Sequence, residues 1–207
     1  IRDRLLQREP DTLHFTAGAY VVAGGDQSVT LFEIARAEAD TLTAEVRHSD
    51  ETVTYPCGCH LCEVEIDPET GEVSIESYIA VDDVGRAVNP MLVHGQSQGA
   101  LAQGIGQALS EHIQYDETTG QLVTGSFMDY APPRASDLPK LEVISNDRPS
   151  PFTPFGIKGA GEGGTTGAPA AVINAILDAL SPLGVSHIDM PATSEKIWRL
   201  IRAANAK

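Results

Sequence analysis

The stretch that most constrains this chain is FGIKGAGEGGTTGAPAAVINAILDAL, residues 155–180. Glycines crowd around a single acidic residue, Glu162, and an apolar pattern with helical spacing follows. Glycine lets the backbone turn sharply and approach a ligand closely. The main-chain N–H groups of such a turn attract anionic groups, as does the N-terminus of the helix that follows. The segment therefore predicts a binding turn and then a helix that begins near Pro169, a favoured first-turn residue.

Two nucleotide-binding motifs compete with this interpretation. The spacing of Gly159, Gly161 and Gly164 fits the dinucleotide fingerprint, but that fingerprint must follow a strand directly. The preceding residues SPFTPFGIK contain two prolines, which makes them a poor strand. A phosphate-binding P-loop fails because no Gly-Lys-Ser/Thr ends the stretch. What remains is a carboxylate in a backbone turn, which can act as a general base; the alternative is that Glu162 is a solvated turn residue.

Period-two alternation marks the strands. In residues 62–85 apolar and polar residues alternate on both sides of Asp-Pro-Glu-Thr-Gly, which predicts a hairpin that turns at residues 67–71. A similar turn, DETTG at residues 116–120, predicts a second hairpin between EHIQY and QLVTGSF. The segment KLEVIS is a further short strand. Near the start of the chain we expect the end of a helix, stopped by Pro10, and then a strand pair around Ala17 and Gly18.

Helical spacing marks the other elements. Thr30 and Glu33 form a capping box that opens one helix, and a cap at Thr193 or Ser194 opens the last. The segment MLVHGQSQGALAQGIGQALSEH is helical but rich in glycine, which predicts close packing against a backbone or a ligand. Strands first mix with helices and then give way to them. The expected class is α+β, with short mixed or antiparallel sheets packed against long helices.

Charge and cysteine content narrow the function. The net charge of −15 argues against nucleic acid and anionic membrane as partners, because both require a basic patch. No apolar run is long enough to span a bilayer, and no signal peptide is visible. Three cysteines at tight spacing do not resemble a secreted disulfide framework, so we expect a reducing compartment, the cytoplasm.

The motif CGCHLC is the main competing candidate for chemistry. Cys57, Cys59, His60 and Cys62 supply enough ligand types for a zinc site. However, Cys62 begins the alternating strand, so the motif also fits a tight turn into a strand with buried thiols. Asp82 and Asp83 similarly fit either metal ligands or the end of a hairpin strand.

Several segments together resemble one family. GIKGAGEGGTTGAPAAVINAILDAL is similar to the active-site segment of the xanthine dehydrogenase and aldehyde oxidase family of molybdenum hydroxylases. YIAVDDVGRAVNPMLVHGQSQGALAQGIGQALSEH, CGCHLCEVEIDPETGEV and DMPATSEKIWRLI resemble the same family, in its carbon-monoxide-dehydrogenase-like large chains. The resemblance implies that residues 1–207 are the C-terminal part of a molybdopterin cofactor-binding domain in a longer large subunit.

The resemblance also assigns roles by position. Glu162 matches the family's catalytic base, which activates a water-derived oxygen for transfer to an aldehyde or heteroaromatic carbon. Gln96 matches a glutamine that binds the cofactor, and Gln103 lies in the same segment. The loop lining the metal site corresponds to Lys158, Gly159, Ala160 and Gly161. The pterin dithiolene holds molybdenum in this family, so no side chain of this chain is expected to ligate a metal.

Cofactors and partners follow from the same resemblance. We expect molybdopterin, in its cytosine dinucleotide form, with molybdenum; FAD and iron–sulfur clusters are expected on partner subunits or domains. Partners would be the N-terminal part of the same large subunit, an FAD subunit, an iron–sulfur subunit and a small-molecule substrate. The chain alone is expected to be an inactive piece of the enzyme. The alternatives are a non-catalytic assembly fragment and a Cys/His metal-binding module at residues 57–62.

Overall fold

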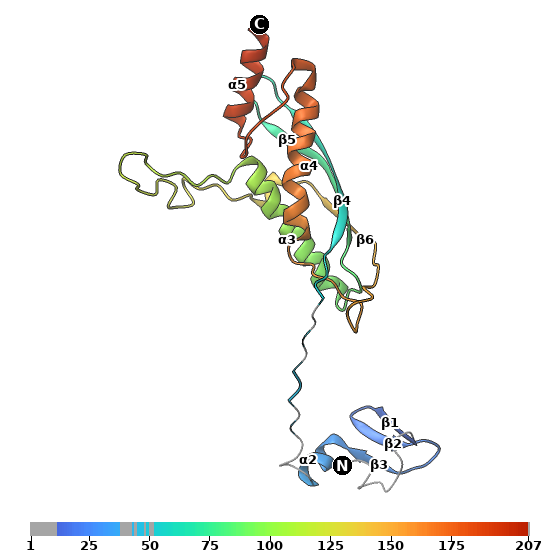
Figure 1. The fold of residues 1–207 in the computed structure, drawn as a ribbon. Coiled ribbons are helices and arrows are strands. Elements are labelled where there is room, and N and C mark those ends of the chain that lie inside the picture. Colours follow the sequence, from blue (N-terminus) through green and yellow to red (C-terminus); the bar gives the residue numbers. More distant parts are fainter. Residues whose placement is uncertain (1–11, 38–42, 44, 48, 50–51, 207) are drawn as a thin grey trace. The chain divides into compact units, whose positions relative to one another are not determined.

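The computed structural model of this 207-residue chain describes residues 12–37, 43, 45–47, 49 and 52–206. The chain divides into two compact units, residues 1–49 and 50–207 (Figure 1). The helix end predicted before Pro10 lies outside the described residues. Whether both units belong to one cofactor-binding domain stays a prediction, and each unit is described by itself.

The first unit is a small antiparallel sheet followed by a short helix. The predicted strand pair around Ala17 and Gly18 is confirmed, and these residues reverse the chain with φ angles of 48° and 79°. The predicted capping box also forms. The Glu33 N–H donates to Thr30 Oγ1 (3.2 Å), and the Thr30 N–H donates to Glu33 Oε2 (2.8 Å). The elements are β1 (Leu13–Thr16), β2 (Ala19–Val22), β3 (Ser28–Thr30) and α2 (Leu31–Ala37).

The second unit is built on a three-stranded mixed sheet in the order β4-β5-β6. The predicted hairpin is confirmed as β4 (Cys57–Ile66) and β5 (Val73–Asp83), which pair antiparallel. KLEVIS is confirmed as β6 (Leu141–Ser145), which pairs parallel with β5. A long crossover through a helix separates β5 from β6, as parallel pairing requires.

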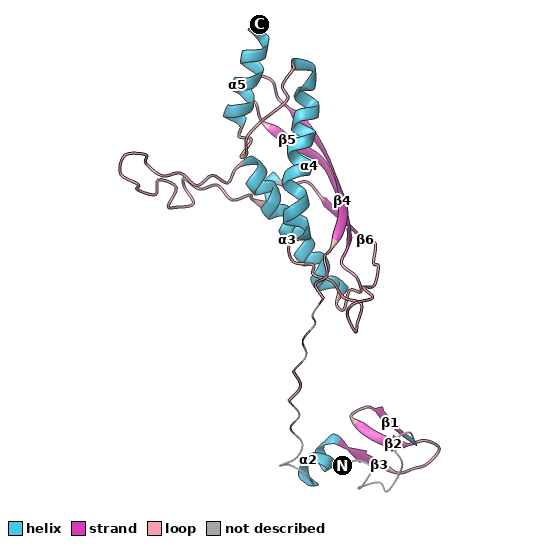
Figure 2. Cartoon of the chain, in the orientation of Figure 1, coloured by secondary structure: helices cyan, strands magenta, loops and turns pink. Residues whose placement is uncertain are grey.

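Two long helices cover one face of this sheet (Figure 2). They are α3 (Pro90–Leu109) and α4 (Gly163–Leu180); α4 packs on β4, and α3 packs on α4. The α+β class with helices packed on a mixed sheet is therefore confirmed. The largest fully buried side chains of the core come from β5, α3, α4 and the last helix: Tyr78, Leu101, Ile105, Val172, Ile176 and Ile197.

The glycines of α3 divide into two kinds. A Cβ added at Gly104 would lie 2.8 Å from Ala168 Cβ, and one added at Gly106 would lie 2.5 Å from Pro133 Cδ. Close packing is therefore confirmed at these two positions. At Gly95 and Gly99 an added Cβ meets nothing within 4 Å, so the first half of α3 does not use its glycines for packing within the described residues.

The predicted start of α4 is wrong by two turns. The helix begins at Gly163, and Pro169 lies inside it. Proline lacks the N–H for one helical bond, so local preference places it at the start of a helix. Tertiary packing overrides this preference. Gly164 lies so close to α3 that an added Cβ would be 2.8 Å from Leu101 N, and Thr165 Oγ1 donates to Ala100 O (3.0 Å).

The predicted second hairpin is also wrong in part. The turn at residues 116–120 forms, with the Gly120 N–H donating to Asp116 O (2.8 Å). Only one isolated bridge, between Tyr115 and Leu122, continues it. The segment between α3 and Arg134 projects away from the helices (Figure 1). Its large apolar side chains, which include Ile113, Phe127 and Met128, are exposed in the described part of the chain. We call residues 111–133 the arm.

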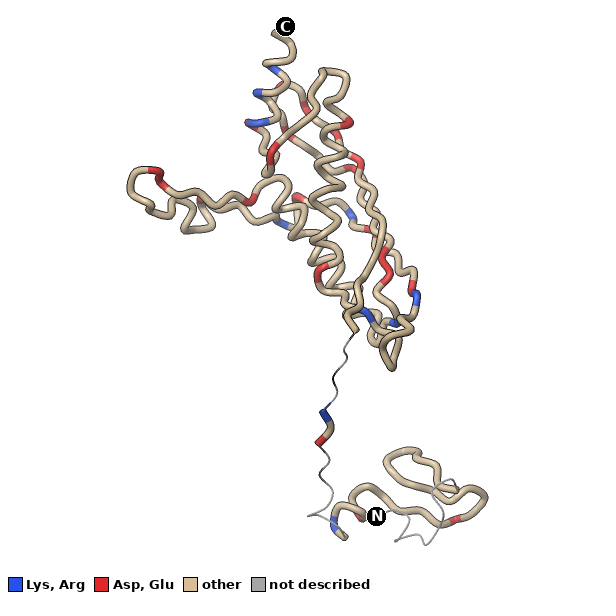
Figure 3. Tube along the Cα trace, in the orientation of Figure 1, with Lys and Arg blue, Asp and Glu red and all other residues tan. Residues whose placement is uncertain are grey.

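The last helix closes the fold. It is α5 (Ser194–Asn205), and Thr193 caps it by accepting from the Lys196 N–H (3.4 Å), as predicted. Figure 3 shows basic residues on this helix, which the sequence identifies as Lys196, Arg199 and Arg202. Among the residues that the structure describes, no helix combines the length and the apolar character needed to cross a bilayer.

Candidate active site

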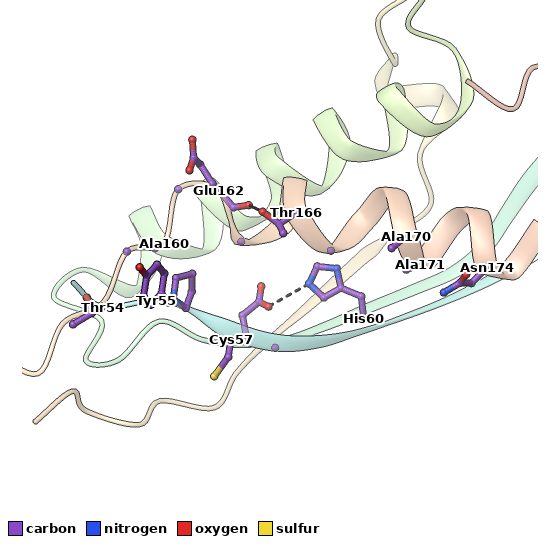
Figure 4. A pocket seen from close by; sticks show the side chains of 17 residues that line it. Thr54, Tyr55, Cys57, His60, Ala160, Glu162, Thr166, Ala170, Ala171 and Asn174 are labelled. Carbon is purple, nitrogen blue, oxygen red and sulfur yellow. Dashed lines mark hydrogen bonds and ion pairs between the residues drawn. The ribbon is translucent and has the colours of Figure 1, made fainter. Parts of the chain in front are cut away.

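A cavity of about 850 Å³ lies between the start of β4, the end of β5 and the N-terminal half of α4. Its lining includes residues 159–162 of the predicted turn, together with His60 and Asp82 from the sheet (Figure 4). A volume of this size is typical of ligand pockets. The structure thus brings the glycine-rich turn to the rim of a cavity, as a binding turn requires.

Glu162 occupies the residue just before α4. Its carbonyl accepts from both the Thr166 N–H and the Thr166 Oγ1 (3.0 Å each), so its backbone is fixed. Its side chain makes no capping hydrogen bond and is exposed. Figure 4 shows the carboxylate directed away from His60. Among the described residues, the Glu162 backbone is thus fixed, while its carboxylate is exposed and has no hydrogen-bond partner.

Lys158 has a defined partner. Its Nζ lies 2.7 Å from Asp83 Oδ2, and both side chains are largely buried. Asp83 Oδ1 also accepts from the N–H groups of Gly85 (2.9 Å) and Arg148 (3.0 Å). The Lys158 hydrogen bond, with these backbone donors, lowers the pKa of Asp83 to about 2. Lys158 therefore anchors the turn to the end of β5, and its ammonium points to Asp83.

The two glutamines lie differently. Gln96 is beside the turn, because a Cβ added at Gly161 would be 4.0 Å from Gln96 Oε1. Gln103 lies two helical turns further along the same face of α3 and is exposed. Neither residue lines the cavity. The structure thus brings Gln96 close to the predicted site residues 159–162 and leaves Gln103 apart from them.

The cysteines do not converge. Strand alternation places Cys57 and Cys59 on the outer face of β4 and Cys62 on the inner face, under α4. Burial raises the pKa of Cys62 to about 11. In the described part of the chain, no group of three or more His, Cys, Asp and Glu side chains is arranged to hold a metal ion. The metal-binding alternative therefore has no support from the geometry.

Sequence reasoning missed one polar pair in the cavity wall. His60 Nε2 lies 3.2 Å from Asp82 Oδ1, and both residues line the cavity. The sequence pattern suggested a role for His60 only as a zinc ligand. A usable signal existed: His60 shares its strand face with Cys62, Val64 and Ile66, so period-two alternation buries it, and a buried histidine needs partners.

Comparison with known proteins shows the family to which the chain belongs. A model of the molybdopterin cofactor-binding domain matches residues 1–139. The chain belongs to this family, and it is a segment of a molybdopterin-binding subunit of the xanthine dehydrogenase family. The match ends before the turn that carries Glu162.

Individual relatives point the same way. The chain is 38% identical over 216 residues to the 6-hydroxypseudooxynicotine dehydrogenase complex subunit gamma of Paenarthrobacter nicotinovorans, covering 99% of this chain and 27% of that protein. A crystal structure of Cu,Mo-CO dehydrogenase superposes with a TM-score of 0.82 at 30% identity, covering 99% of this chain and 27% of that one. Quinoline 2-oxidoreductase from Pseudomonas putida 86 gives 0.78 at 36% identity, covering 97% and 27%. The chain thus spans about a quarter of the length of these relatives.

Proposed function

We propose that this chain forms the part of a molybdenum hydroxylase large subunit that carries the active-site base, Glu162. The reaction would be the oxidation of an aldehyde or heteroaromatic carbon, with oxygen from water. The supporting observation is the position of Glu162, at the start of α4 and at the rim of the 850 Å³ cavity. Two relatives are named for heteroaromatic compounds, quinoline and 6-hydroxypseudooxynicotine, which supports this substrate class.

The turn has room for a cofactor. A Cβ added at Gly159 meets nothing within 4 Å, and one at Gly161 meets only Gln96. The first-turn N–H groups of α4 are not capped by the Glu162 side chain. An open backbone and first-turn N–H groups that this side chain does not occupy suit a ligand with anionic groups, as the molybdopterin cytosine dinucleotide has. When bound, this cofactor supplies the molybdenum that exchanges electrons and oxygen with the substrate.

The residues of this chain would hold and move the proton. Thr166 fixes the Glu162 backbone, and the Lys158–Asp83 pair fixes the other end of the turn. Between these anchors, a Glu162 oxygen would accept the proton from the attacking water. The exposed carboxylate would be enclosed by the rest of the large subunit, and enclosure strengthens the interactions of a general base.

The remaining partners belong to the whole enzyme. We propose FAD and iron–sulfur clusters on companion subunits, a small-molecule substrate and a cytoplasmic location. Relatives that are named as subunits of complexes support this assembly. The 207-residue chain by itself would be inactive, because it spans about a quarter of such subunits.

Glu162→Gln in the complete subunit, purified with its companion subunits, tests the proposal. Turnover should fall by at least about 100-fold, because a general base contributes roughly 10²–10⁴-fold. Molybdenum content, measured by elemental analysis, should stay near that of the unmodified subunit. Glu117→Gln in the exposed turn of the arm is the matched control and should leave turnover unchanged. Near-normal turnover of Glu162→Gln would remove the assignment.

A further inference from the structure

A row of three hydrogen-bonded side chains lies between the sheet and α4, next to the Glu162 cavity. His60 Nδ1 lies 2.9 Å from the Tyr78 hydroxyl, and His60 Nε2 lies 3.2 Å from Asp82 Oδ1. The His60 and Asp82 side chains are only 6% and 11% exposed. Burying such groups costs free energy unless they are paired, so this row is a built feature of the cavity wall.

The two hydrogen bonds of this row run in one direction, from the Tyr78 hydroxyl through His60 to Asp82. Burial raises the pKa of Tyr78, with smaller contributions from Cys62 and Asp82, so its hydroxyl keeps its proton and can donate to His60 Nδ1. A ring nitrogen that lies against a carboxylate oxygen supplies the N–H of the hydrogen bond, because the carboxylate accepts. His60 therefore donates to Asp82 Oδ1, and the row ends on the carboxylate.

Two glycines make room for this arrangement. A Cβ added at Gly58 would collide with Asp82 Oδ1, and one added at Gly167 would lie 2.5 Å from the His60 ring. Gly58 pairs with Asp82 across β4 and β5, so the carboxylate lies over a residue without a side chain. Any larger residue at either position would displace the carboxylate or the ring that orients it.

The second carboxylate oxygen, Asp82 Oδ2, accepts no hydrogen bond from the described residues. It is not sealed in the core either, since the described residues contain no fully buried side-chain oxygen or nitrogen without a partner. Asp82 and His60 both line the cavity. His60 orients the Asp82 carboxylate, and the Oδ2 atom can therefore accept a hydrogen bond from a molecule bound in the cavity.

We propose that Asp82 is a ligand-positioning residue, whose carboxylate, oriented by His60, accepts a hydrogen bond from an N–H group of the molecule in the Glu162 cavity. This inference rests on the proposed function. An ionised carboxylate only accepts hydrogen bonds, so it favours a ligand edge that carries hydrogen-bond donors and repels anionic groups. The matching chemistry is the amino and ring N–H edge of a nitrogen heterocycle. Such an edge occurs in a pterin cofactor and also in a nitrogen-heteroaromatic substrate.

The test uses the complete subunit with its companion subunits and the variants Asp82→Ala and Asp178→Ala. Asp178 is an exposed carboxylate of α4 and serves as the matched control. Molybdenum and released pterin are measured per subunit after dialysis, and the unfolding temperature is recorded for each variant. Kinetics are measured on a ring N–H substrate and on its N-methylated counterpart.

Two results would support the inference and would identify the source of the N–H group. If the cofactor supplies it, Asp82→Ala releases about 10- to 100-fold more pterin on dialysis than Asp178→Ala does, as expected for the loss of a hydrogen bond to a charged group. If the substrate supplies it, cofactor content is unchanged, and KM for the N–H substrate alone rises by about 10- to 100-fold. In either case His60→Ala should reproduce part of the loss, and His60→Gln, which keeps a donor near Asp82, should restore it.

Three results would overturn it. In the first, the unmodified subunit holds molybdenum, but Asp82→Ala has the same cofactor content and KM as Asp178→Ala. The proposed function would then stand without this inference. A loss of cofactor that only follows a lower unfolding temperature, without rescue by His60→Gln, would show a structural role. An unmodified subunit without molybdenum would remove the proposed function and this inference together.

Discussion

Two turns of nearly the same sequence, DPETG at residues 67–71 and DETTG at 116–120, have the same local structure. In each, the threonine hydroxyl donates to the aspartate side chain (2.8 Å), and the glycine N–H donates to the aspartate carbonyl (2.7 and 2.8 Å). The glycines have φ angles of 73° and 70°. Hydrogen bonds from backbone N–H groups and from threonine lower the pKa of both aspartates. Local chemistry alone builds these turns.

The segments that flank the two turns differ. The first turn joins β4 and β5, of 10 and 11 residues, whose inner face packs under the helices. The second is continued by a single bridge in the arm. Gly71 is buried against α5, where an added Cβ would lie 2.6 Å from Trp198 N, whereas Gly120 has nothing within 4 Å. A turn motif therefore fixes where the chain reverses, and burial of an apolar face decides whether strands extend from it.

We expect the largest difference in the free energy of unfolding between alanine variants of two tyrosines, one from each region. Tyr78 is 1% exposed in the packed hairpin, and Tyr115 is 62% exposed in the arm. Tyr78→Ala should lower the free energy of unfolding by about 3–5 kcal/mol, because it leaves a cavity in the core. Tyr115→Ala should change it by no more than about 0.5 kcal/mol. Urea unfolding of both variants measures the gap, and equal losses would show that the arm is part of the core.

Alanine variants of the two turn glycines should show a smaller difference in the free energy of unfolding than the two tyrosine variants. Gly71→Ala combines an unfavourable positive φ with a collision against the α5 backbone, and should cost roughly 3 kcal/mol. Gly120→Ala adds only the conformational strain, about 1 kcal/mol. Urea midpoints again give the measurement. A loss at Gly120 as large as that at Gly71 would mean that the arm packs against something.

The third expected effect is a pH dependence at the end of the packed hairpin that lies opposite its turn. The folded-state pKa of Asp83 is lowered to about 2, below an unfolded value of about 3.9. Its stabilising contribution is therefore fully present above about pH 4 and is lost as the pH falls towards 2. We expect Asp83→Asn to be less stable than the unmodified chain at pH 7, with the difference shrinking between about pH 4 and 2. A difference that is constant over this range would show that the Lys158 pair contributes nothing.

Much of the fold was predictable where the responsible interactions are close in sequence. The capping box at Thr30, the Thr193 cap and the turn at residues 67–71 all depend on residues within a few positions. Predictions failed where distant segments compete with local preference. Pro169 should open a helix on local grounds, but the contact of Gly164 with α3 starts α4 two turns earlier.

The candidate site shows the same division. The glycine spacing pointed to a binding turn around Glu162, and the turn lies at the rim of a cavity. The role of Glu162, and those of Gln96, Gln103 and residues 158–161, stay predictions. Sequence reasoning did not find the partner of Lys158, which lies 75 positions away at Asp83, nor the pairing of His60 with Asp82 across two strands.

By itself, the sequence determined the turns, the helix caps, the strand alternation and the resemblance to molybdenum hydroxylases, because each is carried by residues that are neighbours or recur with a short period. Only the tertiary structure decided where α4 begins, which of the two hairpins extends, and which charged groups meet beside Glu162. These outcomes depend on burial and on contacts between segments far apart in the chain. Loop closure and side-chain packing bring such segments together, and no local pattern records them.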